Sequence, residues 1–179
     1  MKNDNSHSIR LVESLRKNIS DAMANTLEDK FPLSKSATIE KKFNWAVSVC
    51  HYLEENLELN EIINVRRDCR CNDGKSIANK LLKYLDTTKS ILDFVNAFND
   101  NESFAKLEYL CDNKLLFCYP ECYCACVKRI PEELSKTWCY CTLGNAEGIF
   151  KEVFKKDVTI TLIESIKTGG KQCVMEVQW

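Results

Sequence analysis

The sequence predicts an α+β fold, in which N-terminal helices pack on a four- to five-stranded antiparallel sheet with one helix inserted between strands. Apolar residues recur at helical spacing over residues 8–100, and no glycine occurs before Gly74. From residue 104 onward, short runs of strand length alternate with turn signals. A chain of 179 residues suits one hydrophobic core, so we expect a single domain over residues 1–179.

The helical layer is predicted to contain five helices after a disordered tail at residues 1–7. The first helix runs from Ser8 to about Lys30 and ends before Pro32, because a residue that precedes proline is disfavoured in the helical conformation. Asn60 and Ser90 are predicted N-caps, since their side chains can accept hydrogen bonds from free backbone N–H groups. The remaining helices are predicted over residues 36–57, 61–68, 75–86 and 91–100.

The C-terminal part, residues 104–179, is predicted to form the sheet and one helix. The segments Asp112-Asn113-Lys114 and Gly169-Gly170 are turn signals, each of which can join two antiparallel strands. Alternation of side chains places Cys122, Cys124 and Cys126 on one face of a strand. The strands are predicted over residues 104–111, 115–119, 122–129, 158–166 and 172–179, with a short extended segment over residues 137–142 and the helix over residues 144–155.

Composition excludes several classes of partner. The chain carries 25 basic and 26 acidic residues, whereas sequence-independent nucleic-acid binding needs a basic surface. No apolar run approaches the roughly 18 residues that span a bilayer, and the N-terminus lacks the apolar stretch of a signal peptide. We therefore expect a cytoplasmic protein that binds neither nucleic acid nor membrane.

The eleven cysteines are the most distinctive feature of the composition. Cytosolic thiols stay reduced, so their number indicates metal ligation or redox chemistry rather than a disulfide framework. Two C-x-C pairs, Cys122/Cys124 and Cys139/Cys141, could supply the four thiolates of a tetrahedral zinc site. An iron–sulfur cluster is the less expected occupant, and dithiol redox chemistry and plain apolar packing are the other interpretations. The additional candidate thiols are Cys69, Cys71, Cys126 and Cys173.

Aromatic side chains are candidates for the walls of a ligand pocket, with ordinary core packing as the alternative. No serine-nucleophile motif such as G-x-S-x-G occurs, and His51 lies beside the apolar stripe of its predicted helix. The sequence therefore assigns no catalytic residue. The candidate pocket residues are Phe94, Phe98, Phe117, Tyr119 and Trp138.

The C-terminal third resembles the end of the 4-vinyl reductase domain and of L-2-amino-thiazoline-4-carboxylic acid hydrolase-like proteins. A helix that starts at Gly144 is followed by the strand Val158–Ile166, the turn Gly169-Gly170 and the segment Cys173–Val177. The C-x-C pairs, together with the upstream pair Cys69/Cys71, resemble a largely uncharacterised, cysteine-rich prokaryotic branch of these proteins. The resemblance covers about residues 60–179.

This resemblance implies helices packed on an antiparallel sheet, a ligand pocket between them, a homodimer and a cysteine-bound metal. From the resemblance and the cysteine pattern we expect a small-molecule-binding or sensing domain with a cysteine-thiolate metal site. The alternative is an enzyme, either a hydrolase acting on a cyclic amidine or thiazoline or a thiol-dependent redox enzyme.

Overall fold

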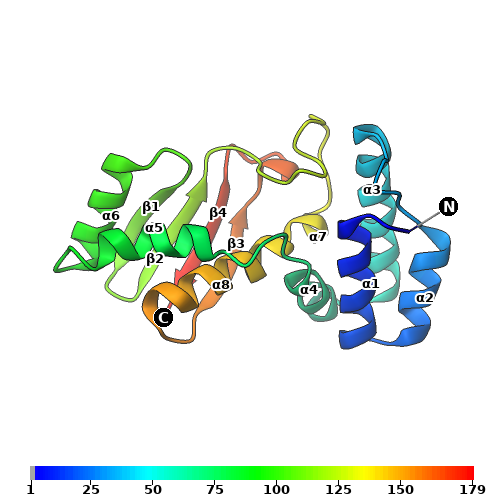
Figure 1. Ribbon diagram of the computed structural model, residues 1–179, viewed down its shortest axis with the longest axis horizontal. Helices are drawn as coiled ribbons and strands as arrows, with labels where there is room; N and C mark the ends of the chain where they lie inside the picture. Colours follow the sequence, from blue (N-terminus) through cyan, green and yellow to red (C-terminus); the bar gives the residue numbers. More distant parts are fainter. Residues whose placement is uncertain (1–2) are drawn as a thin grey trace. The chain divides into compact units, whose positions relative to one another are not determined.

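The computed structural model describes residues 3–179, so residues 1–2 of the predicted disordered tail lie outside the described residues (Figure 1). The chain divides into two compact units. The first unit contains the residues up to Cys71 together with Tyr123–Gly144, and the second contains Asn72–Cys122 and Asn145–Trp179. A single domain over the whole chain stays a prediction.

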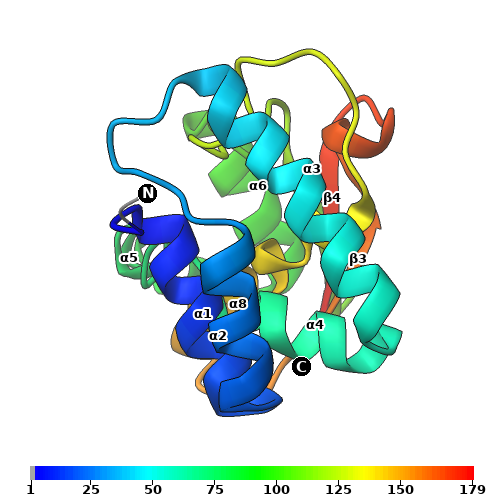
Figure 2. The same ribbon diagram turned by 90° about the vertical axis from the view of Figure 1, so that its right-hand side faces the viewer.

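The first unit is helical. Helix α1 packs against α2 and α4, and the short helix α7 contacts both α3 and α4; Figure 2 shows α1 and α2 side by side. Helices α1, α2 and α3 each follow a residue whose side chain accepts a backbone N–H of the first turn, namely Asn5, Ser20 and Thr38. The bounds are Ser6–Asn18 for α1, Asp21–Lys30 for α2, Ile39–Asn56 for α3, Leu59–Asp68 for α4 and Lys136–Cys139 for α7.

The N-terminal helix differs from its prediction in two ways. It begins at Ser6, because the Asn5 side chain accepts a hydrogen bond from the backbone N–H of His7 at 3.0 Å; residues 3–7 are therefore not a tail. It also breaks at Ile19, where the Ser20 hydroxyl accepts from the N–H of Met23 and starts a new helix. Helix α4 likewise uses Glu58 rather than the predicted Asn60 as its N-cap.

Within the described residues, the second unit contains a four-stranded antiparallel sheet in the order β1-β2-β4-β3, which confirms the predicted α+β class. Helix α6 packs against β1, and α5 packs against α6. Helix α8 begins in the first unit and continues into the second after Gly144. The bounds are Lys106–Cys111 for β1, Lys114–Tyr119 for β2, Thr159–Glu164 for β3, Cys173–Gln178 for β4, Lys75–Leu85 for α5, Ile91–Asn101 for α6 and Cys141–Phe154 for α8.

One face of the sheet carries the core of the second unit. Leu107 pairs with Phe117, which pairs with Met175, so these three buried side chains lie side by side on one face. Phe150 of α8 meets the Phe117 ring edge-on, with 5.2 Å between the ring centroids. The side chain of Asn99 both donates to and accepts from the backbone of Leu107, which attaches α6 to β1.

The predicted strand over residues 122–129 and the predicted extended segment over residues 137–142 are wrong, and both carry cysteines. Residues 122–129 form a loop with a turn, in which the backbone N–H of Lys128 donates to the Cys124 carbonyl at 2.9 Å. Residues 137–142 are helical, because the Ser135 hydroxyl accepts from the Thr137 N–H and starts α7. Cysteine alternates with aromatic residues here, which is the pattern of a strand, but the Ser135 cap favours a helical backbone. The predicted helix 144–155 is part of α8.

Candidate functional site

The cysteines fall into two groups. Among the described residues, all eleven are free thiols. Four of them belong to the second unit, and the other seven belong to the first, where they come from separate segments of the chain. The second-unit cysteines are Cys111, Cys118, Cys122 and Cys173. The first-unit cysteines are Cys50, Cys69, Cys71, Cys124, Cys126, Cys139 and Cys141.

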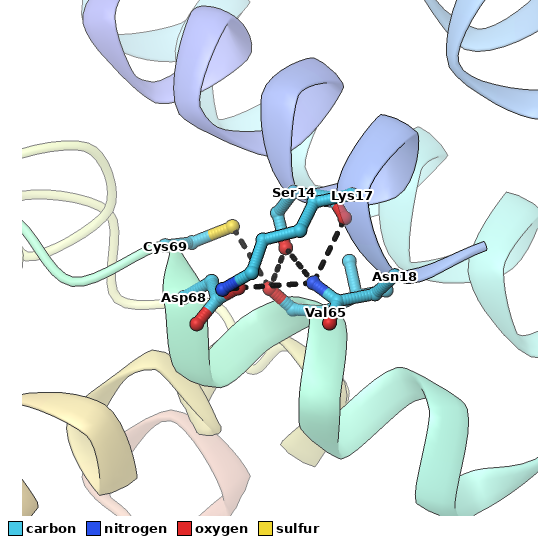
Figure 3. A network of polar contacts seen from close by, with 6 residues as sticks. All are labelled: Ser14, Lys17, Asn18, Val65, Asp68 and Cys69. Carbon is cyan, nitrogen blue, oxygen red and sulfur yellow. Dashed lines mark hydrogen bonds and ion pairs between the residues drawn. The ribbon is translucent and has the colours of Figure 1, made fainter. Parts of the chain in front are cut away.

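The end of α4, which carries the first C-x-C pair, is fixed to α1 by the polar network in Figure 3. The Ser14 hydroxyl donates to the Val65 carbonyl at 2.7 Å, and the Cys69 thiol donates to the same carbonyl at 3.3 Å. At the solvent-exposed edge of this network, Asp68 accepts hydrogen bonds from Lys17 at 2.8 Å and from Asn18 at 3.0 Å. These bonds set where Cys69 and the residues that follow it leave the helix.

Arg66 lies at the centre of the first unit and is only 3% exposed. Its guanidinium donates from Nε to the Thr137 carbonyl at 3.3 Å and from Nη2 to the Trp138 carbonyl at 2.8 Å. The same group lies over the Trp138 ring, 4.4 Å from its centroid. A buried cation is costly unless it is compensated, so these contacts both hold α7 against α4 and stabilise the guanidinium.

Thiols surround this buried cation. Burial acts to lower the pKa of Arg66, but neighbouring cysteines raise it above its ordinary value, and the largest of these contributions come from Cys69, Cys141, Cys50 and Cys124. Burial in turn raises the pKa of the Cys69 and Cys141 thiols, and it raises the pKa of Cys50 to about 12. At neutral pH these thiols are therefore protonated and uncharged beside a permanent positive charge.

Three of the thiols interact with one another in all three pairwise combinations: Cys71, Cys124 and Cys141. They come from the exit of α4, the loop after residue 122 and the start of α8. Arg10 donates from Nη2 to the Cys71 sulfur at 3.7 Å, and Trp138 donates from Nε1 to the Cys124 sulfur at 3.5 Å. Cys71 is exposed, so solvent reaches this group of thiols at that residue, whereas the Cys141 thiol is buried. We call the three thiols the thiol triad.

The structure joins some predicted site residues and separates others. Cys124 and Cys141 of the predicted zinc ligands lie in the triad, and Cys139 lies close enough to affect the pKa of Cys141. Cys122, by contrast, belongs to the second unit. Among residues 3–179, no three His, Cys, Asp or Glu side chains stand close enough together to hold a metal ion as they are. The predicted zinc ligation therefore stays a prediction.

The additional candidate thiols have different surroundings. Cys69 and Cys71 belong to the thiol group at the exit of α4. Cys126 is buried and donates to the Lys42 carbonyl at 3.8 Å, and burial raises its pKa to about 12. Cys173 starts strand β4, opposite Tyr119. Of these four thiols, Cys173 alone belongs to the second unit, whereas the triad belongs to the first.

The predicted pocket aromatics are mainly core residues. Phe94, Phe98 and Phe117 are fully buried in the second unit, and Tyr119 lies there as well. Trp138 belongs to the first unit, where it meets Trp45 edge-on with 5.7 Å between ring centroids. None of the five lines the cavities of about 390 and 330 Å³ that other described residues enclose.

In the sequence Arg66 stands close to Cys69 and Cys71, but its burial and its contacts with α7 were not predicted, and neither was the contact of Arg10 with Cys71. Arg66 falls on the buried stripe of α4 at helical spacing with Ile62, Val65 and Cys69, and a charged residue at such a position is the signal that could have identified it. Arg10 has no such signal, because its contact with Cys71 joins residues 61 positions apart in the chain.

The geometry thus defines an α+β protein with a solvent-accessible thiol triad beside a buried arginine. A profile described as a family of unknown function (DUF6144) matches residues 5–179, and the chain belongs to this family. No curated protein matches the chain. The resemblance to the 4-vinyl reductase domain and the hydrolase-like proteins stays a prediction.

Solved structures of H-NOX proteins are similar to this chain over almost its full length. One from S. oneidensis, in the Fe(II)NO ligation state, is 13% identical, with 98% of each chain covered and a TM-score of 0.45. Another from K. algicida, an Fe(II) unliganded mutant, is 11% identical, covers 99% of this chain and 96% of its own, and has a TM-score of 0.44. TM-scores below 0.5 assign neither a ligand nor a function to this chain. No helix among the described residues is long and apolar enough to cross a membrane.

Proposed function

We propose that this protein is a sensing domain that binds a thiophilic metal ion, with Zn²⁺ as the test case, through Cys71, Cys124 and Cys141. The observation that carries the proposal is that these three thiols, which come from separate segments, lie near enough to influence one another's pKa values and near the buried Arg66. Soft thiolate ligands favour zinc and similar ions over hard cations such as Mg²⁺.

Charge balance supports the proposal. A divalent ion bound by three thiolates carries a net charge of −1, and Arg66 supplies a permanent +1 close by. Without metal, the thiols are neutral, and the guanidinium donates to the carbonyls of Thr137 and Trp138 and lies over the Trp138 ring. Metal binding would thus replace neutral thiols by an anionic centre, which stabilises a buried cation.

The separation of the ligands supports a sensing role. Although the three thiols are near neighbours, no three candidate ligands of the described chain are close enough to hold an ion as they stand, so binding must bring at least one of the three segments closer to the others. Binding is then linked to a local conformational change, and such linkage is the physical requirement for a sensor.

Raised thiol pKa values favour this function over the predicted thiol-dependent redox enzyme. A redox nucleophile needs a thiolate, hence a lowered pKa, whereas the pKa values of Cys71 and Cys141 are raised by burial. A metal ion displaces these protons when it binds, so affinity should fall as the pH decreases.

The test is a competition titration of reduced protein with Zn²⁺ and a chromophoric chelator. Wild-type protein should bind one Zn²⁺ per chain, and Cys71→Ser should weaken binding by more than about tenfold, since even the loss of a group that only orients a ligand costs about that much. Cys111→Ser is the matched control, because Cys111 is also exposed but lies on β1 of the second unit. Equal affinities of the two variants, or no stoichiometric binding by wild type, would refute the proposal.

A further inference from the structure

A second candidate site lies in the first unit, apart from the thiol triad. A cavity of about 390 Å³ opens beside the start of α1, and all of its lining residues belong to this unit. Its volume lies in the range of small-molecule sites. Lys35, Lys42 and His7 line it together with Asp4, and Ile9 and Ala125 add apolar surface.

Positive charge accumulates around this cavity. Lys35 and Lys42 line it, and Asp4, the single acidic group among its described lining residues, accepts a hydrogen bond from the backbone N–H of Lys35 at 2.6 Å. Burial is the largest cause that lowers the pKa of His7 to about 4, and the charges of Arg10, Arg66 and Lys42 lower it further. Cations near His7 thus add to those on the cavity wall, and a bound anion would offset their charge.

The hydrogen-bonding groups suit an oxygen anion. Arg10 Nη2 lies 3.4 Å from His7 Nδ1, so the neutral imidazole can accept there and carry its proton on the other nitrogen. Lysine ammonium groups bind carboxylate and phosphate oxygens as point charges, without the planar geometry that arginine requires. The apolar residues Ile9 and Ala125 can contact the uncharged part of a ligand.

From this arrangement we infer that the cavity binds a small molecule bearing an oxyanion, a carboxylate or a phosphate ester, with Lys42 and Lys35 as the charged contacts. The lining includes none of Cys71, Cys124 and Cys141, but Ala125 and Cys126 follow Cys124 in the same loop. The anion titration therefore uses metal-free protein, so that its outcome does not depend on zinc binding.

The test titrates full-length protein with inorganic phosphate and, separately, with acetate, at constant ionic strength set by sodium chloride. Amide resonances of residues around His7 should shift saturably, and the imidazole pKa of His7 should rise on binding, because an anion favours the protonated ring. A stronger response to phosphate identifies a phosphate ester as the ligand class, and a stronger response to acetate identifies a carboxylate.

The matched variants are Lys42→Met and Lys41→Met, which remove neighbouring lysines of α3, only the first of which lines the cavity. Lys42→Met should weaken binding about tenfold or more, the usual cost of a lost hydrogen bond to a charged group, and Lys41→Met should leave it unchanged. The inference is overturned if neither anion produces a saturable shift, or if both variants bind as wild type does.

Discussion

The two units use the same residue type in opposite ways. In the second unit, Cys118 and Cys173 occupy ordinary positions on the paired strands β2 and β4, opposite Val174 and Tyr119. In the first unit, cysteines from the interior of α3, from the ends of α4 and α8 and from a loop lie close enough to Arg66 to raise its pKa. Sheet pairing fixes where a strand cysteine points, whereas the thiols near Arg66 come from segments that are not paired in a sheet. On the proposed function, the second unit is the scaffold and the first unit carries the metal site.

The largest expected effect tests the scaffold. Phe117→Ala removes a fully buried ring that contacts Tyr119 and Phe150, with centroid distances of 4.7 and 5.2 Å. The free energy of unfolding should fall by about 4 kcal/mol, because a large cavity is left in the core. Denaturant unfolding measures the loss, and zinc stoichiometry of the folded variant should stay at one per chain. A loss below about 1 kcal/mol would contradict a core centred on this ring.

The next effect concerns the buried cation. Arg66→Met should lower the free energy of unfolding by about 3 kcal/mol, because two charge-assisted hydrogen bonds and the contact with the Trp138 ring are lost. Arg66→Lys should restore little, since a lysine cannot reproduce the two-pronged guanidinium geometry. Arg70→Met, at an exposed position, is the control and should change stability by no more than about 0.5 kcal/mol. Similar losses of unfolding free energy for Arg66→Met and Arg70→Met would show that Arg66 contributes no more to stability than an exposed arginine does.

A smaller effect depends on pH. His7 titrates at about 4 in the folded protein and near 6.5 when unfolded, so the unfolded chain binds more protons between these values. Stability should therefore fall as the pH drops from 6.5 to 4, by about 1–2 kcal/mol between pH 7 and 5 after allowance for partial exposure of the ring. His7→Gln should remove this component from the pH dependence measured by urea unfolding. An unchanged slope in the variant would rule out a buried neutral His7.

The smallest effects compare the two parts of the network in Figure 3. Ser14→Ala leaves the buried Val65 carbonyl without its hydroxyl donor and should cost about 1–2 kcal/mol. Asp68→Asn removes the charge that pairs with Lys17 and accepts from Asn18 at the exposed edge of the network, and it should cost about 0.5 kcal/mol or less. Thermal unfolding of both variants checks the order. A larger loss for Asp68→Asn than for Ser14→Ala would show that the exposed ion pair, and not the buried hydrogen bond, holds α4 against α1.

Local signals in the sequence were sufficient for much of the fold. Ser90 caps α6 as predicted, since the signal needs only residues three positions apart. The turn at Asp112-Asn113 joins β1 to β2, and the helix that continues past Gly144 is present. The same kind of local signal at Ser20 and Ser135 went unrecognised, and these two caps account for the split first helix and for the helix in place of the predicted extended segment.

The site could be predicted only in part. Its thiols were identified as candidates by their spacing, but the triad combines Cys71 with Cys124 and Cys141, which no spacing rule connects. Arg66 reaches α7 through contacts with residues 71 and 72 positions later in the chain. Such contacts depend on how the helices pack against one another. No local pattern in the sequence predicts that packing, because it follows from the fold as a whole.

Zinc-edge X-ray absorption on protein loaded with one equivalent of Zn²⁺ tests the central claim most directly, because it counts the sulfur atoms bound to the ion. The account predicts three sulfur ligands at about 2.3 Å in the wild type, and one fewer in Cys71→Ser. A first shell of oxygen and nitrogen alone, or a sulfur count unchanged by Cys71→Ser, would contradict it.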